Sequence, residues 1–420
     1  MPRRWAAGFT TLLTEYFCLP FRQNKCPAES DDEDEDFIME HDHHVLTPED
    51  LNQFTSQFSS ENLVGVTDLG KLYRGKMHIG SDVKDVTVKI IYDNKNVYHY
   101  TGDDTLERFE NELKILQASR IRGNPNIVKV IGYCRGEKTL GIVYDLNPHD
   151  TLENLITRGD FNWMQRVKIA LTLACLLNYL HDRKYLIRNF APYHIVVDQD
   201  FTPIMYEFGL LVGGVLRNKI SASDFRLAPY GYIDGSLVTH GPDTFTVKSD
   251  VFAFGILLVN LISKRVVVDT RDRDDAINMW VLREFKSGRS VVHQTLVGDP
   301  GFDPLDGTII TQLAIQCIED KPKKRPNMKE VIECLETLRV VQEHDKEVNS
   351  FYRNNSNQES NTFTVRSDVF AFDNLLVNLI NRRVGVDTRD RDDAINMWVL
   401  REFKSRRSIV AFNCPPKSCG

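Results

Sequence analysis

The hydrophobic pattern of this 420-residue chain changes once, near residue 150. Before that point most apolar residues lie in short β-branched segments bounded by Gly and Asp, which predict strands. These segments are residues 63–73, 86–91, 127–133 and 140–145. Longer segments with apolar residues at helical spacing predict helices. These are residues 106–119, 163–181, 250–262 and 327–340. We therefore expect an α+β fold with a small β-rich lobe followed by a larger helical lobe, and we expect Ser249 or Asp250 to cap the helix at 250–262.

Charge is distributed unevenly along the chain. The net charge is −7, yet residues 29–50 contain eleven Asp or Glu and no Lys or Arg. Such a segment repels itself and buries little apolar surface, so it predicts a disordered linker. His41, His43 and His44 lie in it and are expected to be solvated, because no rigid scaffold holds them at metal-ligand distances. The negative net charge argues against a dedicated nucleic-acid binder.

One segment occurs twice. Residues 244–292 recur as residues 362–410 with eight differences in 49 positions, and Asp373 and Asn374 stand where the first copy has Gly255 and Ile256. Polar groups in an apolar helix are costly when buried. We therefore predict a partial duplication that is poorly ordered or loosely docked. A gene-model error and a tail that swaps into another molecule are alternatives.

The predicted organisation has five parts. They are an extension with the acidic linker (1–50), a globular domain (51–341), a linker (342–361), the partial duplicate, which is not an independent domain (362–410), and a tail (411–420).

Targeting signals are absent from the sequence pattern. No apolar run approaches the roughly 18 residues of a membrane span, and the first residues lack the apolar core of a signal peptide. Pro2 excludes N-myristoylation. Eight cysteines without metal-ligand spacing suit a reducing, cytoplasmic location. Palmitoylation of Cys18 or Cys26, with peripheral association at the plasma membrane, is an alternative to unmodified thiols.

Ten short motifs follow one another along the globular part of the chain. They are Gly65–x–x–x–x–Gly70, Val86-Thr87-Val88-Lys89, Glu112 in the following helix, Asn124-Pro125-Asn126-Ile127-Val128, Val143-Tyr144-Asp145-Leu146, the loop at residues 186–198, Glu207-Phe208-Gly209, Tyr230-Gly231-Tyr232-Ile233-Asp234, the segment 248–255 and Lys324-Arg325-Pro326-Asn327-Met328. From about residue 58 to residue 340 the chain resembles the protein kinase superfamily. The plant receptor-like and receptor-like cytoplasmic kinases are the most similar group. The resemblance implies a two-lobed protein kinase-like fold.

The resemblance also implies a nucleotide site. Its residues would be Gly65, Gly70, Lys89, Glu112, Asp145 and Leu146. ATP and Mg²⁺ are the implied cofactors, whereas the altered catalytic residues argue that neither is required. Lys89 and Glu112 would clamp the ATP phosphates, or they would form a structural ion pair between helix and sheet, and the sequence favours neither alternative.

The catalytic positions hold other side chains. Asn189 stands at the catalytic Asp, Ala191 at the catalytic Lys and His194 at the metal-binding Asn. An amide cannot accept the substrate proton, and loss of a general base typically costs about 10²–10⁴-fold in rate. Mg²⁺ prefers oxygen ligands, which His194 lacks. Glu207 keeps a carboxylate and is a weak candidate metal ligand, while Thr67 adds a side chain where the Gly-rich loop has glycine.

Regulation is implied by the retained Arg188. In the family this residue contacts a phosphorylated activation segment, and Ser221 and Ser223 lie in that segment here. Phosphorylation there would create a charge-assisted contact, although a solvated loop is the simpler alternative. Gly235-Ser236 replaces the family's Pro-Glu, so Arg325 is expected to lack a carboxylate partner.

We weigh three functions. The first is a catalytically impaired pseudokinase that acts as a binding module, adaptor or decoy in plant receptor or immune signalling, with active receptor-like kinases or immune receptors as partners. The second is a weakly active ATP-dependent Ser/Thr kinase. The third is a non-functional product of a partly duplicated gene. The altered loop at Asn189, Ala191 and His194 favours the first.

Overall fold

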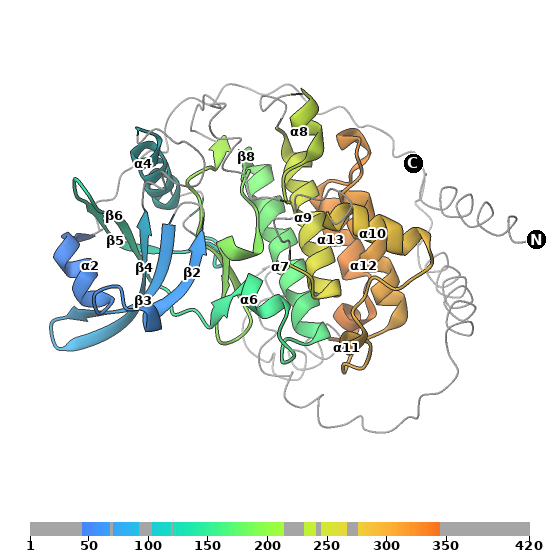
Figure 1. Ribbon diagram of the computed structural model, residues 1–420, viewed down its shortest axis with the longest axis horizontal. Coiled ribbons are helices and arrows are strands. Elements are labelled where there is room, and N and C mark those ends of the chain that lie inside the picture. Colours follow the sequence, from blue (N-terminus) through green and yellow to red (C-terminus); the bar gives the residue numbers. More distant parts are fainter. Residues whose placement is uncertain are drawn as a thin grey trace, which may run out of the picture. The chain divides into compact units, whose positions relative to one another are not determined.

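The computed structural model describes residues 44–67, 70–91, 103–118, 121, 123–213, 231–240, 245–266 and 276–344. A β-rich lobe precedes a helical lobe (Figure 1), which confirms the predicted fold class. The elements of the first lobe are β1 (His44–Val45), α2 (Pro48–Phe54), the 3-10 helix η1 (Ser60–Asn62), β2 (Leu63–Thr67), β3 (Gly70–Ile79), β4 (Asp82–Ile91), α4 (Asp103–Gln117), β5 (Val130–Arg135) and β6 (Leu140–Tyr144).

The helical lobe also contains short strands. Its elements are β7 (Asp150–Thr151), α6 (Leu152–Ile156), α7 (Trp163–Asp182), β8 (Tyr185–Leu186), η2 (Pro192–His194), β9 (Ile195–Val197), β10 (Pro203–Met205), β11 (Val212–Gly213), α8 (Gly235–His240), α9 (Val247–Ser263), α10 (Ile277–Lys286), α11 (Gln294–Val297), α12 (Pro304–Cys317), η6 (Pro322–Lys324) and α13 (Met328–Glu336). None of the described helices is long and apolar enough to cross a membrane.

The sheet of the first lobe places Lys89 at its centre. Its strand order is β1-β5-β6-β4-β3-β2, so β4 lies between two neighbours. Lys89 pairs with Leu72 on one side and with Ile142 on the other. A single strand over residues 63–73 is wrong, because the chain reverses between Thr67 and Gly70 and forms the antiparallel pair β2 and β3.

A small second core covers one face of this sheet. Leu51 of α2 packs there with Met77, Val86, Val88 and other buried residues. Thr47 caps α2 in a capping box with Asp50. Glu49 and Asp50 lie in the first turn, where acidic side chains are stabilised by the helix dipole. The described residues thus include the end of the acidic segment, residues 44–50, which the sequence predicts to be a linker.

Helix α9 begins at Val247, three residues earlier than the range predicted from the sequence. Thr246 is its cap, and Ser249 completes the capping box from the third helical position. Neither Ser249 nor Asp250 is the cap, since Asp250 points into the protein and is fully buried. The last predicted helix is also shorter than expected, because α13 ends at Glu336 rather than at residue 340.

Close packing of α9 on α12 depends on one glycine. A Cβ atom on Gly255 would lie 2.6 Å from Cβ of Cys317 and 2.8 Å from Cγ2 of Ile318. Real Cβ atoms do not approach other atoms so closely, so only glycine allows this approach without a shift of the helices. The neighbouring Ile256 is completely buried in the same core.

Candidate nucleotide and catalytic site

A buried lysine joins three elements of the structure. Lys89 lies on β4, Glu112 on α4 and Glu207 in the loop after β10. The Lys89 ammonium donates hydrogen bonds to Glu112 Oε2 (2.6 Å) and to Glu207 Oε1 (2.7 Å). All three side chains are at most 1% exposed. The structure therefore brings Lys89 and Glu112 together, and it adds Glu207 to the same ammonium group.

Two hydroxyl groups complete this cluster. Tyr144 donates a hydrogen bond to Glu112 Oε1 (2.6 Å), so both oxygens of that carboxylate are bonded. The Thr67 hydroxyl lies 3.4 Å from Glu207 Oε2 and 3.4 Å from the carbonyl oxygen of Gly70. The sequence analysis assigned no role to Tyr144. Its position at the end of a buried strand, within the motif Val143–Leu146, was the available signal.

Burial controls the proton equilibria of the cluster. It raises the pKa of Glu112 to about 7 and outweighs the lowering effect of Lys89; the neighbouring Glu207 carboxylate adds to the rise. Burial alone would lower the pKa of Lys89, but attraction to the two carboxylates outweighs it and raises that pKa. Burial also raises the pKa of the Tyr144 hydroxyl, which stays neutral and acts as a donor. Lys89 is therefore charged at neutral pH, and Glu112 is close to its titration point.

The catalytic loop presents an amide where a base is expected. Asn189 is fully buried, and neither polar atom of its side chain has a hydrogen-bond partner within the described part of the chain. Nδ1 of His194 lies at hydrogen-bond distance from the carbonyl oxygen of Asn189, so this nitrogen carries a proton. Ala191 is buried and supplies no cation. Positions 189 and 191 thus hold neither a carboxylate nor a cation.

Asp250 holds the main chain of this loop. Its Oδ2 accepts a hydrogen bond from Ile187 N (3.0 Å), and its Oδ1 accepts one from Arg188 N (3.0 Å). Nε2 of His181 lies 3.0 Å from Oδ2. Arg188 has a left-handed backbone (φ 67°), which these bonds help to maintain. The sequence signal for this role was an Asp inside an otherwise apolar helix.

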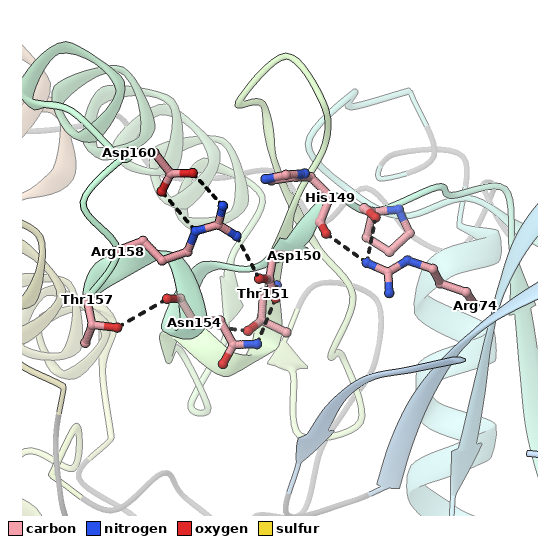
Figure 2. A network of polar contacts seen from close by, with 9 residues as sticks. Arg74, His149, Asp150, Thr151, Asn154, Thr157, Arg158 and Asp160 are labelled. Carbon is pink, nitrogen blue, oxygen red and sulfur yellow. Dashed lines mark hydrogen bonds and ion pairs between the residues drawn. The ribbon is translucent and has the colours of Figure 1, made fainter. Parts of the chain in front are cut away.

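The motif Val143–Leu146, which resembles the hinge between the two lobes of protein kinases, lies at the end of β6 beside β4. Asp145 is exposed and forms a 2.8 Å ion pair with Lys84. The carbonyl oxygen of Leu146 accepts a hydrogen bond from the buried Thr87 hydroxyl (2.8 Å). Figure 2 shows the segment that follows, in which Arg158 reaches both Asp150 and Asp160. The hinge is thereby bonded to two side chains of β4, Lys84 and Thr87.

Arg325 has a carboxylate partner, so the expected loss is wrong. Its NH2 group donates to Asp234 Oδ1 (2.8 Å), and its NH1 group bonds the other oxygen of the same carboxylate. Both side chains are buried. Asp234 precedes Gly235-Ser236, and its position allows it to supply the charge that Ser236 lacks. The Arg325 pair lowers the pKa of Asp234 against the opposing effect of burial.

Other predicted residues are placed as follows. Gly65 lies on β2, and Gly70 begins β3. The Arg188 side chain is largely buried, with its guanidinium carbon 5.8 Å from the centre of the Phe245 ring. Ser221 and Ser223 lie outside the described residues, so their phosphorylation stays a prediction.

The residues at the metal positions do not fit Mg²⁺. One oxygen of Glu207 is bonded to Lys89, and His194 directs Nδ1 to a backbone carbonyl. Mg²⁺ needs near-octahedral oxygen ligands, usually carboxylates and water. Within the described ranges, no three His, Cys, Asp or Glu side chains cluster so that they could hold a metal ion.

Comparison with known families agrees with this geometry. The family model described as protein tyrosine and serine/threonine kinase matches residues 58–335. The chain belongs to the protein kinase family.

Plant receptor-like cytoplasmic kinases are among the similar members of that family. The probable serine/threonine-protein kinase PBL15 of Arabidopsis thaliana is 30% identical over 303 residues, which cover 69% of this chain and 68% of the relative. PBL4 of the same plant is 32% identical over 268 residues, with 62% and 64% covered. An EPD1-interacting receptor-like cytoplasmic serine/threonine-protein kinase of Nicotiana benthamiana is 29% identical, with 70% and 64% covered. The predicted resemblance to this plant kinase group is confirmed.

Proposed function

We propose that this kinase-family chain is catalytically impaired and serves as a binding module, adaptor or decoy in plant receptor or immune signalling. The observation that supports this best is the buried amide of Asn189 at the position of the catalytic base. A carboxamide has no basic site for the substrate proton. Nothing else in the described loop offers a carboxylate there.

The phosphate-handling side chains support the same proposal. Ala191 removes a cation, and Glu207 is engaged by Lys89 instead of a metal ion. If the lost base and the lost cation each cost about a hundredfold in rate, activity falls by roughly four orders of magnitude. The altered metal positions would lower it further.

Partners and location are part of the proposal. Active receptor-like kinases or immune receptors would bind the kinase-like fold as proteins in the cytoplasm or at the plasma membrane surface. Neither ATP nor Mg²⁺ would be required for that role. The three relatives are named as serine/threonine-protein kinases, PBL15 and PBL4 as probable ones, and we take proteins of that class as the first partners to test.

Phosphate transfer tests the proposal. The purified chain is incubated with γ-labelled ATP and Mg²⁺ or Mn²⁺ beside its Lys89→Met variant, with the kinase domain of PBL15 as the positive control. We expect equal background incorporation by the wild type and by Lys89→Met. Transfer by the wild type that disappears in Lys89→Met would show an active kinase.

Restoring the family residues supplies the complementary arm. The variant Asn189→Asp/Ala191→Lys/His194→Asn/Glu207→Asp is expected to transfer phosphate at least about a hundredfold faster than the wild type. The control variant carries only Ala191→Lys, which restores a cation but no base. A restored variant that folds and stays inactive would place the defect elsewhere in the cleft.

A weakly active Ser/Thr kinase is the second candidate. The buried Lys89–Glu112 pair favours it, because this pair positions phosphates in active kinases. The names of the relatives favour it too. The Lys89→Met comparison separates the two candidates directly. The third alternative, a non-functional gene product, is expected to be unstable. A single cooperative unfolding transition in calorimetry would argue against it.

A further inference from the structure

Strands β2 and β3, which carry Gly65 and Gly70, form a pair that we call the Gly-rich hairpin. This hairpin approaches the helical lobe at two points. β2 contacts both β7 and η2 of the helical lobe. At the first point the buried Thr67 hydroxyl lies 3.4 Å from Glu207 Oε2. At the second, a Cβ on Gly65 would come within 2.9 Å of Thr151 Cγ2. Thr151 cannot easily move away, because its side chain is buried and accepts a hydrogen bond from Asn154 N (3.3 Å).

A third contact joins β3 to the segment after the hinge. NH2 of Arg74 donates hydrogen bonds to the carbonyl oxygens of His149 (2.8 Å) and Pro148 (3.3 Å), and Figure 2 shows the guanidinium directed at them. The next residue, Asp150, accepts a hydrogen bond from Asn154 Nδ2 (2.7 Å). The segment is therefore bonded to the sheet on one side and to α6 on the other.

A nucleoside triphosphate would need the space and the charge that these contacts use. In kinases the Gly-rich loop covers the phosphates and the strand lysine pairs with them. Here Thr67, which stands between Gly65 and Gly70, lies beside Glu207, and two carboxylates already bind Lys89. An entering triphosphate would also meet the charge of Glu207, which no metal ion offsets in a site unsuited to Mg²⁺.

We propose that the Gly-rich hairpin closes the nucleotide cleft of this chain, so that the folded protein takes up no nucleotide, and that Thr67 is the residue that closes it. The contacts of Thr67, Gly65 and Arg74, rather than a bound nucleotide, hold the two lobes together. This inference rests on the proposed function, because a partner that binds both lobes needs them in a fixed arrangement.

Amine labelling tests closure without any nucleotide. Lys89 and Lys84 lie on the same strand, with side chains 1% and 40% exposed. With an amine-reactive reagent and mass spectrometry, we expect Lys89 to react at least about a hundredfold more slowly than Lys84, because labelling requires an opening of the cleft. Thr67→Gly should raise the Lys89 rate about tenfold or more. Val66→Gly should leave it unchanged, since Val66 lies on the same strand with its side chain exposed.

Nucleotide binding supplies the second readout. A ligand at a hundred times its Kd raises the Tm of a domain of this size by several degrees. Millimolar ATP, with or without Mg²⁺, should shift the wild-type Tm by less than about 1 °C. Thr67→Gly/Arg74→Ala should gain a measurable shift, whereas Val66→Gly should not.

The outcomes separate this inference from the proposed function. ATP binding by the wild type without phosphate transfer would overturn closure and leave the proposed function intact. Phosphate transfer by the wild type would overturn both. If the Thr67→Gly variants do not fold, the wild-type labelling rates of Lys89 and Lys84 still decide, and similar rates would overturn closure.

Discussion

Lys89 shares one positive charge between Glu112 and Glu207 where solvent has almost no access. With all three groups ionised, the cluster carries one net negative charge, which burial disfavours. One bound proton removes that excess, and for this reason the pKa of Glu112 rises to about 7. Proton binding at this cluster is therefore linked to folding.

The linkage predicts a pH dependence that a single substitution removes. The pKa of Glu112 rises from 4.5 to about 7 on folding, so the folded chain holds the extra proton between those values. As pH rises through this window, the wild type should lose about 3 kcal/mol of its free energy of unfolding relative to Glu112→Gln, which cannot ionise. Urea unfolding of both proteins from pH 4.5 to pH 8 measures this difference.

Glu107→Gln is the matched control, because Glu107 lies on the same helix and is exposed. Its stability should follow that of the wild type at every pH. A constant difference between the wild type and Glu112→Gln across the window would mean that Glu112 stays ionised throughout.

At the scale of elements, α9 shows what a hydrophobic pattern can and cannot predict. Its apolar run predicts a buried helix, and the helix is there. The predicted cap was wrong: Ser249 and Asp250 are both favoured cap residues by type, but Thr246 is the N-cap. Only the tertiary structure shows that the Asp250 side chain is buried and accepts hydrogen bonds from the backbone of Ile187 and Arg188. The same limit explains the missed turn between β2 and β3, where the apolar pattern continues through the reversal.

The contact between α9 and α12 predicts a large effect for a small substitution. Gly255→Ala places a methyl group where Cys317 and Ile318 already lie. Overpacking of this kind typically costs about 1–3 kcal/mol, which corresponds to a fall in Tm of roughly 2–12 °C for a domain of this size.

Calorimetry measures this fall, with Gly159→Ala as the control because a Cβ there would meet nothing within 4 Å. Equal Tm values for Gly255→Ala and the wild type would mean that the two helices separate easily.

At the scale of the whole molecule, the order of short motifs was enough to predict a β-rich lobe followed by a helical lobe. It could not predict contacts that close the cleft, since Thr67 and Glu207 are 140 residues apart and neither motif specifies the other's rotamer. It also missed Asp234, because the motif places the carboxylate two residues later than the one that reaches Arg325. Motifs identify which residues belong to the site, whereas the side chains that these residues contact depend on tertiary packing.

Packing around α9 also bears on the repeated segment, which lies outside the described residues. Asp373 would put a side chain at the place of Gly255, where a Cβ would clash with Cys317 and Ile318, and Asn374 would put an amide at the place of the fully buried Ile256. The second copy cannot replace α9. Deletion of residues 345–420 should therefore change the Tm by less than about 2 °C and leave the elution volume consistent with an unchanged oligomeric state. A fall of more than about 5 °C, or a loss of oligomers, would mean that this segment packs on the domain.

The carboxylate of Asp250 accepts hydrogen bonds from the backbone amides of Ile187 and Arg188, and these two bonds do not involve the side chains at positions 189, 191 and 194. Asp250 thus fixes the main chain at the start of the loop whatever side chains stand at positions 189 and 191. A chain selected only for what it binds would lose its reactivity first and its architecture last.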